Sequence, residues 1–384
     1  MGETRLMSLT NLADADDDWA YLELLEDDDL ERMRQWTGQA CQDPGQRTLT
    51  QIRGMTRAEG LLYNRRRRDW LDAGPTWETS SVQQAMNDIG AVLGAGGDRG
   101  ATDVPFVVGQ PGVGKTMLVK RIAAEVMDEE CLAQWAEEQR TPPTVTRAGR
   151  RKVRFRPVVY LDVRDQVSAI GLERAILDAL GEITTGDTTA AVHRALQLHN
   201  VRLIVIDELQ FIAFGSKMGQ QIHNLLKGLT NQGVQLLLCG NDREWVLGHG
   251  GDEVSYRTTK RQSSGRWVEI PLEPLLYSDD PSAPSVDEWK NLLAEWEHRL
   301  RLADPGPEGW LHEYLADYAW VRTHGFHNAL SLLVRQAARR AIDDGTERIT
   351  RATFDRVVLQ VEYEKHREHE VRQLDIGKYR FDVR

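Results

Sequence analysis

The chain has 384 residues, of which 41% are hydrophobic and 28% are charged, a composition typical of a globular protein with room for two or three domains. No apolar run approaches the roughly 20 residues of a membrane-spanning helix, and the N-terminus lacks a signal-peptide pattern, so we expect a cytoplasmic protein without a membrane partner. The widely spaced Cys41, Cys131 and Cys239 argue against a disulfide framework or a zinc site.

The formal net charge is -11, but charge is distributed unevenly along the chain. Between Asp14 and Glu31 there are ten acidic residues and no basic one. In contrast, Arg65 to Arg68 are four consecutive arginines, and Arg147 to Arg156 hold six basic residues in ten. The acidic total therefore does not exclude a nucleic-acid partner.

Residues 1–75 are predicted to form an acidic N-terminal arm with short helices. Apolar side chains are interspersed in its acidic block, so the block can either dock on a partner protein or remain solvated. These apolar residues are Trp19, Tyr21, Leu22, Leu24 and Leu25.

Residues 76–271 alternate helical patterns with short apolar runs, beginning with a helix expected at 82–93. This alternation predicts an α/β fold, with a mostly parallel five-stranded sheet covered by helices. The expected strands are 104–109, 158–163, 203–207, 236–239 and 267–270.

Beyond Pro271 the strand signals stop and helical periodicity takes over. We therefore expect a separate helical lid over residues 285–361, followed by a charged tail at 362–384. The expected helices are 286–300, 310–321, 328–342 and 350–364.

A phosphate-loop motif follows the first expected strand and precedes a helical run. In such a motif, backbone N–H groups at the helix N-terminus face the phosphates of ATP. Lys115 would neutralise the β and γ phosphates, and the Thr116 hydroxyl would bind Mg²⁺. The motif consists of Gly109, Gln110, Pro111, Gly112, Val113, Gly114, Lys115 and Thr116.

Two adjacent acids end the apolar strand 203–207. Asp207 would hold Mg²⁺, and Glu208 would polarise the water that attacks the γ phosphate. Because a further strand lies between the two motifs in the sequence, the pattern favours P-loop ATPases over kinase-like P-loop proteins. Asn241, after the strand 236–239, is either a third contact to the attacking water or an ordinary turn asparagine.

With these motifs and several further segments, the chain resembles the TniB-like AAA+ ATPases of bacterial transposons, which are relatives of the Orc/Cdc6 initiator clade. The similarity covers roughly residues 60–361. Besides the phosphate loop and Ile206-Asp207-Glu208, it rests on Pro157-Val158-Val159-Tyr160-Leu161-Asp162-Val163, His324-Gly325-Phe326, Leu332-Leu333, Ala337-Ala338 and Ile349-Thr350.

The resemblance implies an ATP- and Mg²⁺-dependent AAA+ protein that forms a homo-oligomeric ring or filament on DNA and engages a transposase. AAA+ rings complete each site with an arginine of the neighbouring subunit, for which Arg257, Arg261 and Arg266 are candidates and Arg261 is favoured. Many AAA+ proteins also carry an arginine three residues after a lid glycine. Here Asn328 stands at that spacing from Gly325, which puts a cis arginine sensor in question.

A basic segment between the first core helix and the second strand is the candidate for sequence-independent contacts to DNA phosphates. Basic residues alternate with Val153 and Phe155 in this segment, a pattern that is equally typical of a solvated basic loop or a charged edge strand. The basic residues are Arg147, Arg150, Arg151, Lys152, Arg154 and Arg156.

Together these features predict an ATP-hydrolysing AAA+ regulator that oligomerises on duplex DNA and recruits or activates a transposase or recombinase through its arm or tail. One alternative is a P-loop signalling or defence switch that acts on a protein partner without binding DNA. A replication-initiator-type loader fits less well, because the residues after 361 are too few for a winged-helix domain.

Overall fold

The computed structural model describes residues 27–37, 41–75, 78–94, 103–140, 155–163, 168–212, 217–241 and 266–381. The chain divides into two compact units. The first contains residues up to 37, 85–110 and 115–271, and the second contains 38–84, 111–114 and 272 onward. No helix in the described ranges is long and apolar enough to cross a bilayer.

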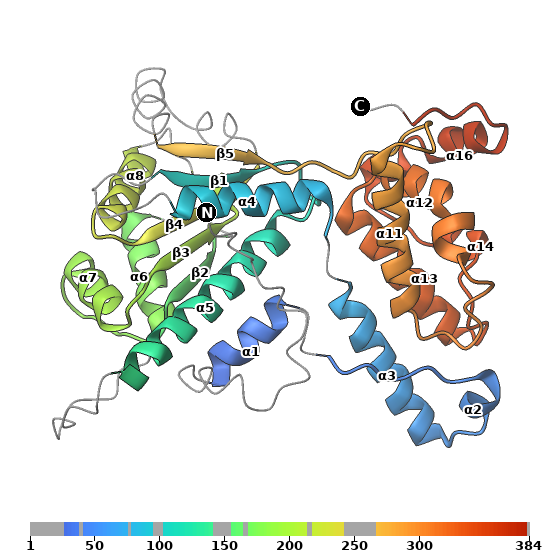
Figure 1. Cartoon of the computed structure of the whole chain (residues 1–384), viewed down its shortest axis with the longest axis horizontal. Helices are drawn as coiled ribbons and strands as arrows, with labels where there is room; N and C mark the ends of the chain where they lie inside the picture. Colours follow the sequence, from blue (N-terminus) through green and yellow to red (C-terminus); the bar gives the residue numbers. More distant parts are fainter. Residues whose placement is uncertain are drawn as a thin grey trace. The chain divides into compact units, whose positions relative to one another are not determined.

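A five-stranded parallel sheet forms the centre of the first unit, with the strand order β2-β3-β4-β1-β5 (Figure 1). The strands are β1 (Val104–Val108), β2 (Val158–Asp162), β3 (Leu203–Asp207), β4 (Gln235–Gly240) and β5 (Trp267–Pro271). Their ends lie within one residue of those predicted. The predicted α/β fold with a parallel five-stranded sheet is therefore confirmed.

Helices cover both faces of this sheet (Figure 1). Side chains such as Phe106, Leu161 and Ile204 form one buried cluster with α6, α7 and α8. The opposite face packs against α5, which begins at Lys115, directly after the phosphate loop. The helices in this part of the chain are α1 (Asp27–Trp36), α4 (Ser80–Gly94), α5 (Lys115–Arg140), α6 (Ala169–Leu180), α7 (Thr188–Leu198), η3 (Leu209–Phe211) and α8 (Lys217–Thr230).

The described end of the acidic arm packs on the first unit. Helix α1 contacts α5, and its Met33 side chain is fully buried. Asp29, also buried, forms a 2.8 Å ion pair with Arg156. Helix α1 thus docks on the chain's own core, while the two alternatives for the acidic block, docking on a partner or remaining solvated, stay predictions. The rest of the acidic block lies outside the described residues.

The second unit is helical, and its core contains the fully buried Trp289 and Trp296. Residues 38–84, which the sequence assigns mostly to the arm, belong to this unit. The predicted domain division at 75, 271, 285 and 361 stays a prediction. The helices are α2 (Leu49–Arg53), α3 (Arg57–Ala73), α11 (Pro284–Arg299), η4 (Trp310–Tyr314), α12 (Ala316–Thr323), α13 (His327–Asp343), α14 (Arg351–Asp355), α15 (Val361–Glu364) and α16 (Arg367–Asp375).

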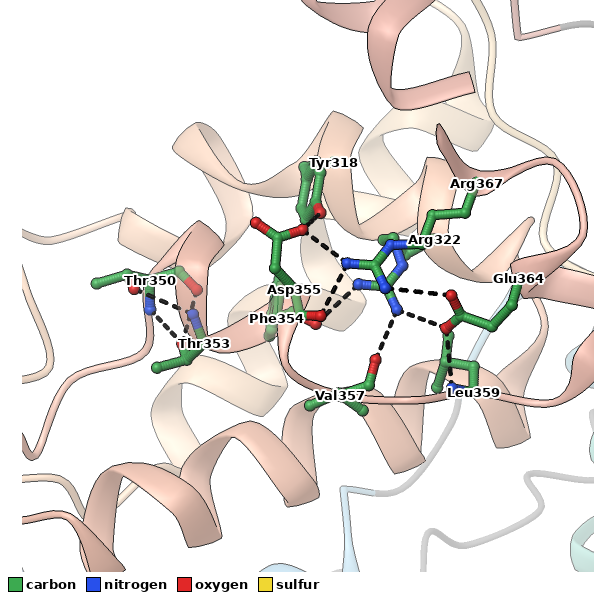
Figure 2. Close-up of polar contacts among 10 residues, drawn as sticks. All are labelled: Tyr318, Arg322, Thr350, Thr353, Phe354, Asp355, Val357, Leu359, Glu364 and Arg367. Carbon is green, nitrogen blue, oxygen red and sulfur yellow. Dashed lines mark hydrogen bonds and ion pairs between the residues drawn. The ribbon is translucent and has the colours of Figure 1, made fainter. Parts of the chain in front are cut away.

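The single helix expected at 350–364 is instead two short helices, α14 and α15. Figure 2 shows the reason, the buried guanidinium of Arg322 on α12. It donates to the carbonyl oxygens of Phe354 at 2.7 Å and Val357 at 2.8 Å, and to the Glu364 carboxylate at 2.8 Å. Because the side chain satisfies carbonyls that a longer helix would bond internally, the chain can turn after α14.

The helix expected at 310–321 is likewise interrupted. Residues Trp310–Tyr314 form the π-helical turn η4, and α12 begins at Ala316. The Glu297 carboxylate accepts hydrogen bonds from the backbone N–H groups of Trp310 and Leu311, each at 3.1 Å. Glu297 therefore caps the first turn, and the second helix starts separately.

We expect Arg322→Met to destabilise the second unit by ~1–3 kcal/mol, because two buried carbonyl groups lose their donors. Arg340→Met, the same substitution at an exposed site near the end of α13, should change the stability little. Denaturant unfolding of both variants measures the difference. Faster amide hydrogen exchange confined to residues 353–364 should accompany the loss, and equal stability of the two variants would contradict the structural role of Arg322.

Candidate nucleotide-binding site

The phosphate loop joins β1 to α5. Gly112 and Gly114 have φ values of +88° and +107°, which side-chain-bearing residues rarely adopt, so the loop requires glycine at both positions. Lys115 is buried, and its Nζ donates to the carbonyl oxygens of Gly109 at 2.9 Å and Gln110 at 3.0 Å. The ammonium group is therefore held over the start of the loop.

Burial lowers the pKa of Lys115, whereas the nearby Glu208 and Asp207 carboxylates act in the opposite direction. Only β4 separates β1, which leads into the loop, from β3, so the loop lysine and the two acids lie at the same edge of the sheet. Thr116 lies half-buried in the first turn of α5, and Val113 is buried.

Asp207 is the last residue of β3, and its carboxylate is held from two directions. The Tyr160 hydroxyl donates to Oδ2 at 2.7 Å, and the backbone N–H of Glu208 donates to Oδ1 at 2.8 Å. Only 2% of Asp207 is exposed. These hydrogen bonds orient the carboxylate, and the buried Cys239 thiol is a further hydrogen-bond partner of Asp207.

Glu208 turns away from the strand with left-handed backbone angles, φ 61° and ψ 39°. Such a conformation is uncommon for residues other than glycine and tends to persist where the surrounding structure enforces it. The Gln210 side-chain amide donates to the Glu208 carboxylate, and its Oε1 accepts the backbone N–H of Asn241 at 3.3 Å. Gln210 therefore links the candidate base to the end of the next strand.

Asn241 directly follows β4, which lies between β3 and β1 in the sheet. In a parallel sheet the carboxyl ends of neighbouring strands share one edge. This order places Asn241 between the strand that carries Asp207 and the strand that precedes the phosphate loop.

No sequence motif indicates Tyr160, Cys239 or Gln210 as residues of this site. Cys239 lies opposite Asp207 on the neighbouring strand, and burial raises the pKa of its thiol, so the thiol stays protonated. Tyr160 stands in a segment that supported the family resemblance, but its contact with Asp207 depends on strand register. No motif spacing signals such a contact.

The oxygen donors present suit a magnesium ion. In the described part of the chain no cluster of three or more His, Cys, Asp or Glu side chains is arranged to hold a metal. A magnesium ion here would therefore depend on the Thr116 hydroxyl, Asp207 and phosphate oxygens, a sparse protein ligand set that is usual for Mg²⁺ at phosphate sites.

Most of the predicted arginine and DNA contacts lie outside the described residues, namely Arg257 and Arg261 and five of the basic group, Arg147, Arg150, Arg151, Lys152 and Arg154. Arg266 is described and immediately precedes β5. In the second unit, the backbone N–H of Asn328 donates to the Gly112 carbonyl at 3.0 Å. The residue at the spacing of a lid arginine therefore contributes a main-chain contact to the loop.

Arg156 requires a correction. It was grouped with the predicted DNA contacts, but only 6% of it is exposed and its Nε donates to Asp29 at 2.8 Å. Its Nη1 also donates to the Ala179 carbonyl. A guanidinium engaged in this way supports the packing of α1 and has no free donor face for a DNA phosphate.

Residues 99–245 match the family model of the AAA domain, and no curated protein has significant sequence similarity to the chain. Similar solved structures include Cdc6p from Pyrobaculum aerophilum, with 14% identity, TM-score 0.44, and coverage of 77% of this chain and 75% of that one.

The Aeropyrum pernix ORC1 protein, solved in complex with DNA, has 18% identity, TM-score 0.49, and coverage of 80% and 72%. Thermotoga maritima RuvB, a Holliday junction branch migration motor, has 16% identity, TM-score 0.41, and coverage of 77% and 76%. Similarities at this level are no basis for inferring function.

Proposed function

We propose that this protein is an ATP-hydrolysing AAA+ regulator that oligomerises on duplex DNA and recruits or activates a transposase or recombinase. The observation that supports ATP hydrolysis best is the strand order, which brings Lys115 after β1, Asp207 and Glu208 at the end of β3, and Asn241 directly after the intervening β4 to one edge of the sheet. The AAA domain match over the same residues agrees with it.

The roles of these side chains follow from their charge and placement. The loop N–H groups and Lys115 would bind the phosphates, and Glu208 would accept a proton from the attacking water. Magnesium, held by Thr116 and Asp207, would supply charge neutralisation at the phosphates. In an oligomer, Arg261 of a neighbouring copy would complete the site.

The DNA part of the proposal depends on the basic segment that includes Arg150, Arg151 and Arg154, and on the resemblance to TniB-like transposon ATPases. Arginine clusters bind duplex DNA through phosphate contacts that carry no sequence information. The correction at Arg156 shortens this group by one residue without changing its character.

We expect the protein to bind random-sequence duplex DNA in ATP and Mg²⁺, with affinity that falls steeply as salt rises. Binding should be lost in ADP, in Lys115→Ala, and in the triple variant Arg150→Glu, Arg151→Glu, Arg154→Glu. Fluorescence anisotropy across a salt series measures the affinity, and retained ATP binding by the triple variant shows that its nucleotide site is intact.

Two outcomes separate the proposal from its alternative. ATP-dependent, salt-sensitive binding that the triple variant loses supports assembly on DNA through the basic segment. If the wild-type protein binds and hydrolyses ATP but retains no DNA in any nucleotide state, a signalling switch that acts on a protein partner becomes the better description.

A further inference from the structure

Tyr160 connects the candidate magnesium-binding carboxylate to the N-terminal helix. In the register of the sheet Tyr160 lies opposite Val205, so its side chain shares a face with Asp207, two residues further along β3. The 2.7 Å hydrogen bond from its hydroxyl to Asp207 follows from this placement. Because a phenol is protonated at neutral pH, the hydroxyl acts as the donor and the carboxylate accepts.

The Tyr160 ring is itself held by two helices. The Trp36 ring of α1 lies 5.4 Å from it between centroids, at an interplanar angle of 49°. On α5, the Lys120 ammonium lies 5.3 Å from the ring centroid, within the range of a cation–π contact. The hydroxyl therefore points to Asp207 from a ring whose position depends partly on α1.

Helix α1 has its own anchors on this unit. The Asp29–Arg156 ion pair has side-chain exposures of only 3% and 7%, and Met33 is fully buried. Arg156 lies two residues before β2, the strand that carries Tyr160, so α1 contacts this segment of the chain near both of its ends. The buried ion pair, the buried Met33 and the ring contact of Trp36 are the contacts that dock α1 on this unit.

We propose that Tyr160 is a positioning residue for Asp207, and that α1 keeps Tyr160 in place through Trp36. Docking of α1 thereby favours Mg²⁺ binding at the nucleotide site. This inference rests on the proposed ATPase function. A carboxylate that loses its hydroxyl partner can rotate away from the direction needed for a metal ion, and loss of such outer-shell partners typically weakens metal binding or activity by ~10–100-fold.

The test compares Tyr160→Phe, which keeps the ring and removes only the hydroxyl, with Tyr277→Phe. Tyr277 is a suitable control because its hydroxyl also donates to a carboxylate, Asp317, at 2.5 Å, and that carboxylate is not a proposed ligand of Mg²⁺ or of the nucleotide. Direct binding of Mn²⁺ to the ADP-loaded full-length protein is measured by electron paramagnetic resonance. The Mg²⁺ concentration for half-maximal ATP hydrolysis is measured in parallel.

Tyr160→Phe should weaken Mn²⁺ binding by ~10-fold or more and raise the half-maximal Mg²⁺ concentration, with the melting temperature close to that of Tyr277→Phe. Trp36→Ala should act in the same direction and less strongly. Arg34→Ala, which removes an exposed arginine of the same helix, should leave Mn²⁺ binding unchanged.

Unchanged or tighter Mn²⁺ binding in Tyr160→Phe would overturn the positioning role. A Trp36→Ala protein that matches Arg34→Ala would overturn the contribution of α1. A wild-type protein that binds Mn²⁺ with ADP but hydrolyses no ATP would count against the proposed function alone, because the Mn²⁺ comparison still decides the role of Tyr160.

Discussion

Glu208→Gln should bind ATP as tightly as the wild type and hydrolyse it at least ~100-fold more slowly, because general-base assistance typically contributes ~10²–10⁴-fold. The amide has nearly the shape of the carboxylate, so the backbone turn at φ 61° and the contact from Gln210 can persist. What it lacks is the ability to accept a proton from the attacking water.

Phosphate release under saturating ATP gives the rate, and a fluorescent ATP analogue gives the affinity. Glu273→Gln makes the same chemical change at an exposed position just after β5 and should leave both values unaltered. Near-normal hydrolysis by Glu208→Gln would show that another group activates the water, and the assignment of Glu208 would fail.

The strands could be predicted closely because strands buried on both faces of a parallel sheet read as continuous apolar runs. The runs at 104–108 and 203–207 are buried throughout. Strand order could not be predicted, because it depends on which distant segments pair. Sequence motifs indicated Lys115, Asp207 and Glu208. They could not indicate Tyr160, because its contact with Asp207 depends on how β2 pairs with β3.

Two predictions that proved wrong, the helix at 350–364 and the role of Arg156, have a common origin in buried arginines whose partners are distant in the sequence. Periodicity alone predicts one helix at 350–364, since it detects an apolar face and not a carbonyl satisfied by Arg322 from another helix. Likewise, Arg156 belongs to a basic run in sequence and to a buried ion pair in the fold. Composition cannot distinguish a solvated arginine from a paired one.

The four-arginine run at 65–68 illustrates the same distinction and allows a strong test of stability. Arg66 is exposed, whereas Arg67 is buried and donates to both carboxylate oxygens of Glu347, at 2.6 and 2.9 Å. Their side chains are only 1% and 4% exposed. This bidentate pair fixes α3 to the loop that follows α13.

Arg67→Met should lower the free energy of unfolding by ~3–5 kcal/mol, because it leaves the buried Glu347 carboxylate without its charged partner. Arg66→Met, one residue earlier on the exposed face of α3, should change it little. Denaturant unfolding followed by circular dichroism measures both variants.

The double variant Arg67→Met, Glu347→Gln separates the loss of a contact from the burial of an unpaired charge. The glutamine can still accept the hydrogen bond that Ala303 N–H gives to Glu347 at 3.1 Å, so part of the lost stability should return. If the double variant is no more stable than Arg67→Met, the unpaired charge is not the cause, and loss of the cation–π contact between the Arg67 guanidinium and the Tyr63 ring becomes the explanation.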